Sequence, residues 1–223
     1  DPAHRHLSQL IALHPGRDFS PLSTPKLAKA CETELKVRNG RGGWKGAWRA
    51  ACWARLRNGD EALNFYNDLV SGTPNPNLLN GSRFQIDGNL GAGGALPEML
   101  LQSHLRSIDP KADTIATATF VPYREDPKQP NHFVAVVPPD SLAKAPFILD
   151  LLPALPSSWP QGSVKGLRAR GGFEVDIQWK GGKLHQATIH AKRDGAFRIY
   201  DQGKLSKVIS LKQGQSKVWP ETN

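Results

Sequence analysis

The sequence predicts an α+β protein in which helices come first and a small antiparallel β-domain follows. Apolar residues recur at helical spacing up to about residue 106. From residue 163 onward they alternate with polar residues, which is the pattern of half-buried strands. Because helices and strands are hardly interleaved, two packed units are favoured over a βαβ sheet. We place the helical unit at 1–106, a connecting segment with short strands at 107–156 and the β-domain at 157–223.

Two helices are expected first. Thr24 can cap the first helix, with Pro25 at its first position, and the Asn-Gly pair at 39–40 stops it. The second helix starts near Gly43 and ends at the Asn-Gly pair at 58–59. Its buried face has apolar residues at helical spacing, which predicts packing against neighbouring helices.

Two more helices follow. Asp60 can cap a third helix, which closes at 71–72. Glycines at 91, 93 and 94 open a fourth helix that runs through about Arg106. Very short turns join the first three helices, so neighbours should run antiparallel.

Strand patterns fill the rest of the chain. Short alternating segments lie at 114–121, 133–137 and 147–152. The clearest strand covers 173–179, and a Lys-Gly-Gly-Lys hairpin turn at 180–183 leads into the returning strand. Further short strands complete a small antiparallel domain of about 60 residues.

Composition argues against two classes of partner. The net charge of the 223 residues is +9, but Lys and Arg are scattered, with no block of five or more. No apolar run approaches the ~20 residues that a membrane helix needs. We therefore expect neither a nucleic acid nor a membrane as partner. Cys31 and Cys52 fall on apolar helix positions and are expected as buried free thiols, with a disulfide as the alternative.

The N-terminus resembles neither a signal peptide nor a natural start. Residues 1–6 lack an apolar stretch and an initiator methionine, so we expect the chain to begin inside a longer protein or after a cleavage. An Asn-Gly-Ser sequon at 80–82 is compatible with secretion. We expect a secreted or periplasmic protein.

Asp87 is the best catalytic candidate. It lies in a Gly-rich turn before a helix, where backbone can approach a ligand closely. Asn89 follows two residues later, and the helix N-terminus adds partial positive charge. Asp is also a common turn and capping residue, so a purely structural role is the alternative.

A histidine pair and a tryptophan are candidate ligand-binding residues. His4 and His6 are alternate residues, which point to opposite sides of an extended segment, and no third ligand is visible. A zinc site is therefore not expected, and hydrogen bonding to a substrate or a plain surface pair remain open. Trp44 begins a helix, where its ring could pack on the C–H face of a sugar; a core position is the alternative.

Several stretches match one known family in order and spacing. They are residues 4–16 (HRHLSQL…HPG), 43–56 (GWKGAW…WARL) and 84–104 (FQIDGNLG…EMLLQSH), with 151–156 and 162–173 in the C-terminal part. The family's own segments read HRHLSHL…YPG, GW(S)xAWxxxxWARL and FQIDGNFG…EMLLQSH. The chain therefore resembles glycoside hydrolase family 95 over nearly its whole length, except for an apparent insertion near residues 107 to 146.

The resemblance implies a fold and an activity. In that family an (α/α)6 barrel holds the active site and a β-domain follows, so this chain would hold the last helices of the barrel. The α-L-fucosidases of the family invert the anomeric centre. Their general base falls on Asp87, and their histidine-rich segment, which lines the sugar pocket, falls on His4 and His6. With Trp44 and Asn89 these make up the expected site.

The same resemblance implies what is missing. The general acid of the family is a glutamate far upstream, and Glu98 is not an obvious substitute because it lies more than two turns into its helix. A lone carboxylate can activate water but cannot protonate the leaving oxygen. We therefore expect a fucosylated oligosaccharide or glycan as substrate, an upstream part of the same enzyme as partner, and no cofactor or metal.

Three departures from the family pattern bear on the substrate. Gln9 replaces a usual histidine, Lys45 a usual serine and Leu90 a usual phenylalanine. An α-L-galactosidase of the same family is therefore one alternative. A non-catalytic carbohydrate-binding piece is the alternative from another class of protein.

Overall fold

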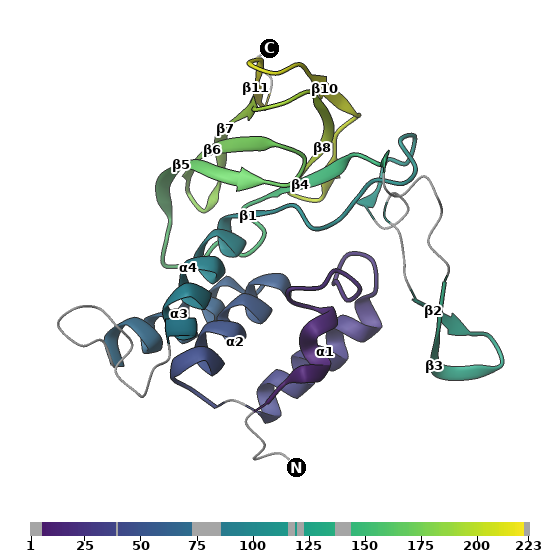
Figure 1. The fold of residues 1–223 in the computed structure, drawn as a ribbon, viewed down its shortest axis with the longest axis vertical. Helices are drawn as coiled ribbons and strands as arrows, with labels where there is room; N and C mark the ends of the chain where they lie inside the picture. The colour runs from purple at the N-terminus through teal and green to yellow at the C-terminus, as the bar shows by residue number, and fades with distance from the viewer. Residues whose placement is uncertain are drawn as a thin grey trace.

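The computed structural model describes residues 6–38, 40–72, 86–115, 119, 123–136 and 144–220. It has an α+β architecture, with helices gathered in one part and strands in another (Figure 1). The four α-helices are α1 (Pro25–Val37), α2 (Gly43–Arg55), α3 (Gly59–Gly72) and α4 (Ile86–Leu100), preceded by a short 3-10 helix at Ser8–Ala12 that the sequence did not predict. None of the helices in the described ranges is long and apolar enough to cross a membrane.

The first three helices lie where the sequence predicts them, and Thr24 occupies the N-cap position of α1 as predicted, but neither Thr24 nor Asp60 makes the predicted side-chain capping bond. The Thr24 hydroxyl donates back to the carbonyls of Asp18 and Ser20 and caps no amide of α1. For α3 the cap is Asn58, whose Oδ1 accepts from the Glu61 amide at 3.0 Å. Asp60 instead accepts from the amide of Ser157 at 2.7 Å, because this helix start faces the chain that leads into the β-domain.

The fourth helix differs from its prediction at both ends. It already begins at Ile86, so Asp87 lies within its first turn and not in a turn before it. It ends at Leu100 and not near Arg106, because Leu101 and Gln102 form strand β1. The Gln102 side chain donates to the carbonyls of Ala54 and Glu98, and it thereby satisfies the last turns of α2 and α4.

Helices α2 and α3 run antiparallel, as the short turn between them predicts. Ala47, near the start of α2, clusters with Leu69, near the end of α3, so these two helices are antiparallel. Ala92 of α4 joins the same cluster. Towards the other end, Arg55 of α2 pairs with Glu98 of α4. The helices α2 and α4 are therefore parallel and lie side by side.

The strands form two larger sheets and one hairpin. One sheet has the order β1-β4-β8-β10, with β9 also paired to β8, and the other has the order β11-β7-β6-β5. The strands are β1 (Leu101–Gln102), β2 (Tyr123–Asp126), β3 (Gln129–Ala135), β4 (Phe147–Leu151), β5 (Gln161–Ala169), β6 (Phe173–Lys180), β7 (Lys183–Ala191), β8 (Gly195–Asp201), β9 (Lys204–Leu205), β10 (Ile209–Leu211) and β11 (Ser216–Trp219). The predicted turn joins β6 to β7, where Gly181 and Gly182 have φ of 60° and 70°.

One strand pair departs from the expected antiparallel pattern. Strand β4 pairs with β8 in parallel, with Phe147 opposite Phe197, whereas the other strand pairs of the described chain are antiparallel. A parallel pair needs a long connection, and here β5, β6 and β7 supply it by forming the opposite sheet. Strands β1 and β4, which come before residue 157, therefore lie in the same sheet as β8, β9 and β10, which come after it.

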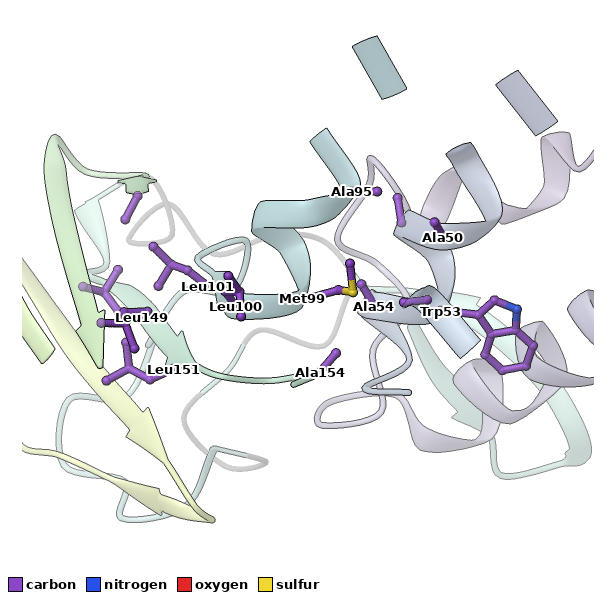
Figure 2. Close-up of a cluster of buried hydrophobic side chains, with 14 of the residues drawn as sticks. Ala50, Trp53, Ala54, Ala95, Met99, Leu100, Leu101, Leu149, Leu151 and Ala154 are labelled. Carbon is purple, nitrogen blue, oxygen red and sulfur yellow. The ribbon is translucent and has the colours of Figure 1, made fainter. Parts of the chain in front are cut away.

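Helices and strands share one core. The two sheets meet where the rings of Phe173 and Phe197 pack edge to face, with centroids 4.7 Å apart. Figure 2 shows Met99, Leu100 and Leu101 between alanines of α2 and leucines of β4. As expected, Cys31 and Cys52 are buried free thiols. The fold thus fixes the β-domain to the C-terminal ends of α2 and α4, and leaves their N-terminal ends away from it (Figure 1).

The hairpin β2–β3 lies inside the apparent insertion. Its contacts with the helical part include an ion pair between Lys26 and Glu125, at 2.5 Å, and the rings of Phe19 and Tyr123, 6.1 Å apart. A two-stranded hairpin is at best marginally stable alone, so these contacts hold it against α1.

Candidate active site at the N-terminal ends of α2 and α4

The site residues lie at one end of the parallel pair α2 and α4. Gly91 sets how closely these helices approach, because a Cβ added there would lie only 2.9 Å from the Ala47 Cβ. Gly43 and Asp87 each precede this contact by four residues, which is about 6 Å along a helix. The start of α2 and the first turn of α4 therefore lie at the same level.

Asp87 presents its carboxylate at this end. Its side chain is exposed, and its Oδ1 accepts a hydrogen bond from the Gly88 amide at 3.0 Å. The first turn of α4 carries partial positive charge, which interacts favourably with an acidic side chain. A carboxylate in this position can accept a proton from water. Asn89 lies on the same turn and is half-buried.

His6 and Trp44 are in contact. Their ring centroids are 5.3 Å apart with an interplanar angle of 38°, and Trp48 follows at 6.4 Å from Trp44. The Trp48 indole donates to the carbonyl of His14 at 2.8 Å, which fixes the row of rings along α2. His6 itself is exposed, and its carbonyl accepts from Arg38 at 3.2 Å. The row leaves an aromatic surface beside the start of α2.

The structure thus brings four of the five predicted site residues to one end of the helix pair. His6 touches Trp44, while Asp87 and Asn89 lie on the first turn of the neighbouring helix. His4 lies outside the described residues. Within the described ranges, no three His, Cys, Asp or Glu side chains gather as metal ligands.

Arg49 supports the site and was missed by the sequence analysis. Its side chain is 1% exposed, and its guanidinium donates to the carbonyls of Arg38, at 2.8 Å, and Lys45, at 3.3 Å. Burial is the main cause that lowers its pKa. These bonds tie the segment before α2 to the helix and so position Trp44. The sequence feature that could have revealed Arg49 is that it is the single charged residue in the otherwise apolar stretch 47–54.

Glu98 has a structural partner and lies far from Asp87. Its carboxylate accepts from Arg55 through both oxygens, at 2.7 Å and 3.2 Å. Eleven residues separate it from Asp87 on α4, which is about 16 Å along the axis. Two carboxyl groups that act on one glycosidic bond by inversion lie about 6.5–9.5 Å apart. Glu98 therefore cannot be the acid that works with Asp87.

Comparison with known families agrees with the fold and the motifs. Residues 1–100 match the Glycosyl hydrolase family 95 catalytic domain, and residues 146–222 match the Glycoside hydrolase family 95, C-terminal domain. Both models describe glycoside hydrolase family 95, and the catalytic-domain match precedes the C-terminal-domain match along the chain. The chain belongs to glycoside hydrolase family 95.

Curated relatives carry related names. Alpha-L-fucosidase 2 of Arabidopsis thaliana is 34% identical over 95% of this chain. Probable alpha-fucosidase A of Aspergillus oryzae and of Aspergillus niger are 32% and 34% identical, each over 79% of the chain. The chain spans only 22%, 22% and 20% of the length of these three proteins.

Proposed function

We propose that this chain is the C-terminal part of an inverting α-L-fucosidase and that Asp87 is its general base. One observation carries the proposal: Asp87 is an exposed carboxylate on the first turn of α4, level with the His6–Trp44 contact at the start of α2. The family, and the names of the relatives, support the substrate class.

The proposed reaction uses a water molecule as nucleophile. The Asp87 carboxylate removes a proton from the water while the water oxygen forms a bond to the anomeric carbon. The glycosidic bond breaks on the opposite face of the sugar, and the leaving oxygen takes a proton from a general acid. Since Glu98 is too far away and bound to Arg55, we assign the acid to a glutamate of the upstream part of the protein.

The neighbouring side chains would bind the sugar. The Trp44 ring can pack on the C–H face of a pyranose, and the His6 ring beside it can hydrogen-bond a hydroxyl. We place His4 and Asn89 in the same role. Lys45, half-buried next to Trp44, adds a positive charge at the rim.

An exposed stripe on α4 gives the upstream part a place to pack. Ile86 and Leu90 are 52% and 71% exposed, and they lie one turn apart. Gly93 and Gly94 continue the stripe, and an added Cβ at either would meet no atom within 4 Å. An apolar helix face of this kind is normally buried. We propose that upstream barrel helices cover it.

The catalytic role of Asp87 is tested by Asp87→Asn in the native-length protein that contains this chain. The amide keeps the shape but cannot accept the proton, so kcat on a fucosyl oligosaccharide should fall about 10²–10⁴-fold while sugar binding persists. If Asp87 only caps α4, the variant should instead keep its turnover and nearly all of its stability, because asparagine caps a helix about as well as aspartate. Measuring kcat and Tm on the same sample separates the two roles.

Asp194→Asn is the matched control. Asp194 lies in the β-domain and pairs with Lys212 on the surface, at 2.9 Å. Its loss removes one carboxylate without touching the α2–α4 end, so kcat should stay unchanged. A near-normal kcat for Asp87→Asn would refute the assignment.

A further inference from the structure

A cleft lies between the helical part and the β-domain. It has a volume of about 340 Å³ and is lined by Pro15, Gly16, Arg17, Asp18, His104 and Arg170. His104 follows β1 and Arg170 follows β5, so the cleft lies at the C-terminal end of α4. Helix α4 is 15 residues long, or about 22 Å, and this length separates the cleft from Asp87.

Cations dominate this cleft. Neither the Arg17 nor the Arg170 guanidinium forms an ion pair or a hydrogen bond with another described residue. The pKa of Arg170 is lowered by partial burial first, and then by the charges of Arg55 and Arg17. The carboxylate of Glu98 opposes this effect but is already bound by Arg55. Asp18 is the one acidic residue of the lining.

His104, which lines the cleft, is a buried and neutral side chain. His104 is 6% exposed, and its Nδ1 is buried without a hydrogen-bond partner. Burial, together with the charges of Arg55, Arg170 and other neighbouring bases, holds its pKa well below the ordinary value, so the ring is neutral.

We propose that this cleft binds a small oxyanion, such as sulfate or phosphate, between Arg17 and Arg170 and beside the neutral ring of His104. The planar guanidinium groups match the paired oxygens of such an ion, and the ion offsets their mutual repulsion. Because one arginine belongs to the helical part and the other to the β-domain, the ion ties the two together. The proposal is independent of the fucosidase assignment, since the cleft is remote from Asp87.

The test titrates sulfate into the native-length protein at pH 7, with chloride adjusted to constant ionic strength. Isothermal titration calorimetry should show saturable binding, and Tm should rise with sulfate concentration because the ion binds only the folded state. Arg170→Gln should weaken the affinity about tenfold or more. The hydrolytic kcat should not change with sulfate.

Two further variants make the result decisive. Arg168→Gln is the matched control, because Arg168 lies two residues earlier, is exposed and pairs with Glu174 at 3.1 Å; it should bind sulfate as the unmodified protein does. Arg17→Gln changes an exposed loop residue, which avoids a folding defect, and should weaken binding as Arg170→Gln does. Sulfate binding that is absent, or that the Arg168, Arg170 and Arg17 variants share equally, would overturn the proposal.

Discussion

Three ionisable side chains that are buried or largely buried make the stability of this protein depend on pH. Burial, reinforced by Arg55, lowers the pKa of His14 to about 4, and burial holds the pKa of His104 well below 6.5. Burial raises the pKa of Asp150 to about 6, although its ion pair with Arg57 opposes the shift. The histidines and the aspartate therefore act in opposite directions.

The sign of each contribution follows from proton uptake. Between pH 6.5 and about 4 the unfolded chain protonates His14 and His104, while the folded protein does not, so acidification destabilises the fold. Between pH 6 and 3.8 the folded protein holds a proton on Asp150 that the unfolded chain has lost, so acidification relieves the cost of burying that carboxylate. The combined contribution of the two histidines is larger than that of the aspartate, so acidification lowers the free energy of unfolding overall.

We predict that lowering the pH from 7 to 5 reduces the free energy of unfolding by about 2 kcal/mol. In Asp150→Asn the opposing contribution is gone, so the same change should reduce it by about 1 kcal/mol more. Urea unfolding at both pH values gives, for each protein, the slope with which the free energy of unfolding changes between pH 7 and pH 5. The absolute stability of the variant also reflects its lost ion pair, so the slope is the quantity to compare. Equal slopes would contradict the assignment of Asp150.

The sequence could identify most residues of the proposed site, but it could not identify the charged residues that are buried. Asp87, His6 and Trp44 were found because their motifs resemble those of a known family. Arg49 and Asp150 were not found, since a charged residue in sequence is normally a surface residue. Their burial depends on segments far apart in the chain, such as the pairing of Arg57 with Asp150 across the helix–sheet junction.

The packing of α2 against α4 is what places the proposed site. Gly91 allows the close approach, because it has no side chain to meet Ala47. Gly93, two residues further on, faces open space in this chain. Both positions are helical, so the same substitution at the two sites separates helix propensity from packing.

Gly91→Ala should lower the free energy of unfolding by about 1–2 kcal/mol, because overpacking outweighs the gain in helix propensity. Gly93→Ala, the matched control, should raise it by up to about 1 kcal/mol in this 223-residue chain. Chemical denaturation of the two variants measures both effects. If Gly91→Ala is as stable as Gly93→Ala, the close contact does not limit the helix pair.

Elements were easier to predict than their ends and partners. Periodicity located the four α-helices of the described residues and the β6–β7 hairpin, since both depend on local patterns. The predicted side-chain capping bonds do not form, because the side chains of Thr24 and Asp60 bond to loops that only the tertiary structure brings near. The parallel pairing of β4 with β8 could not be predicted either. It depends on β5, β6 and β7, which lie between these two strands in the chain and form the opposite sheet.

At the scale of the whole molecule, the chain is a helical part and a two-sheet β-domain with one continuous core. The core accounts for the attachment of the β-domain, but it leaves the stripe from Ile86 to Gly94 on α4 uncovered. The relatives are several times longer than the 223 residues of this chain. A base from this chain and an acid from the upstream part would then make one active site.

Proton NMR of the first sugar released from a fucosyl oligosaccharide tests that central claim most directly. Hydrolysis by the native-length protein should give β-L-fucose first, because water attacks the face opposite the leaving group. The α anomer should appear only later, by mutarotation. The chain alone, which lacks the proposed acid, should release no fucose, and adding the upstream part should restore turnover. Initial release of α-L-fucose, or full activity of the chain alone, would contradict the account.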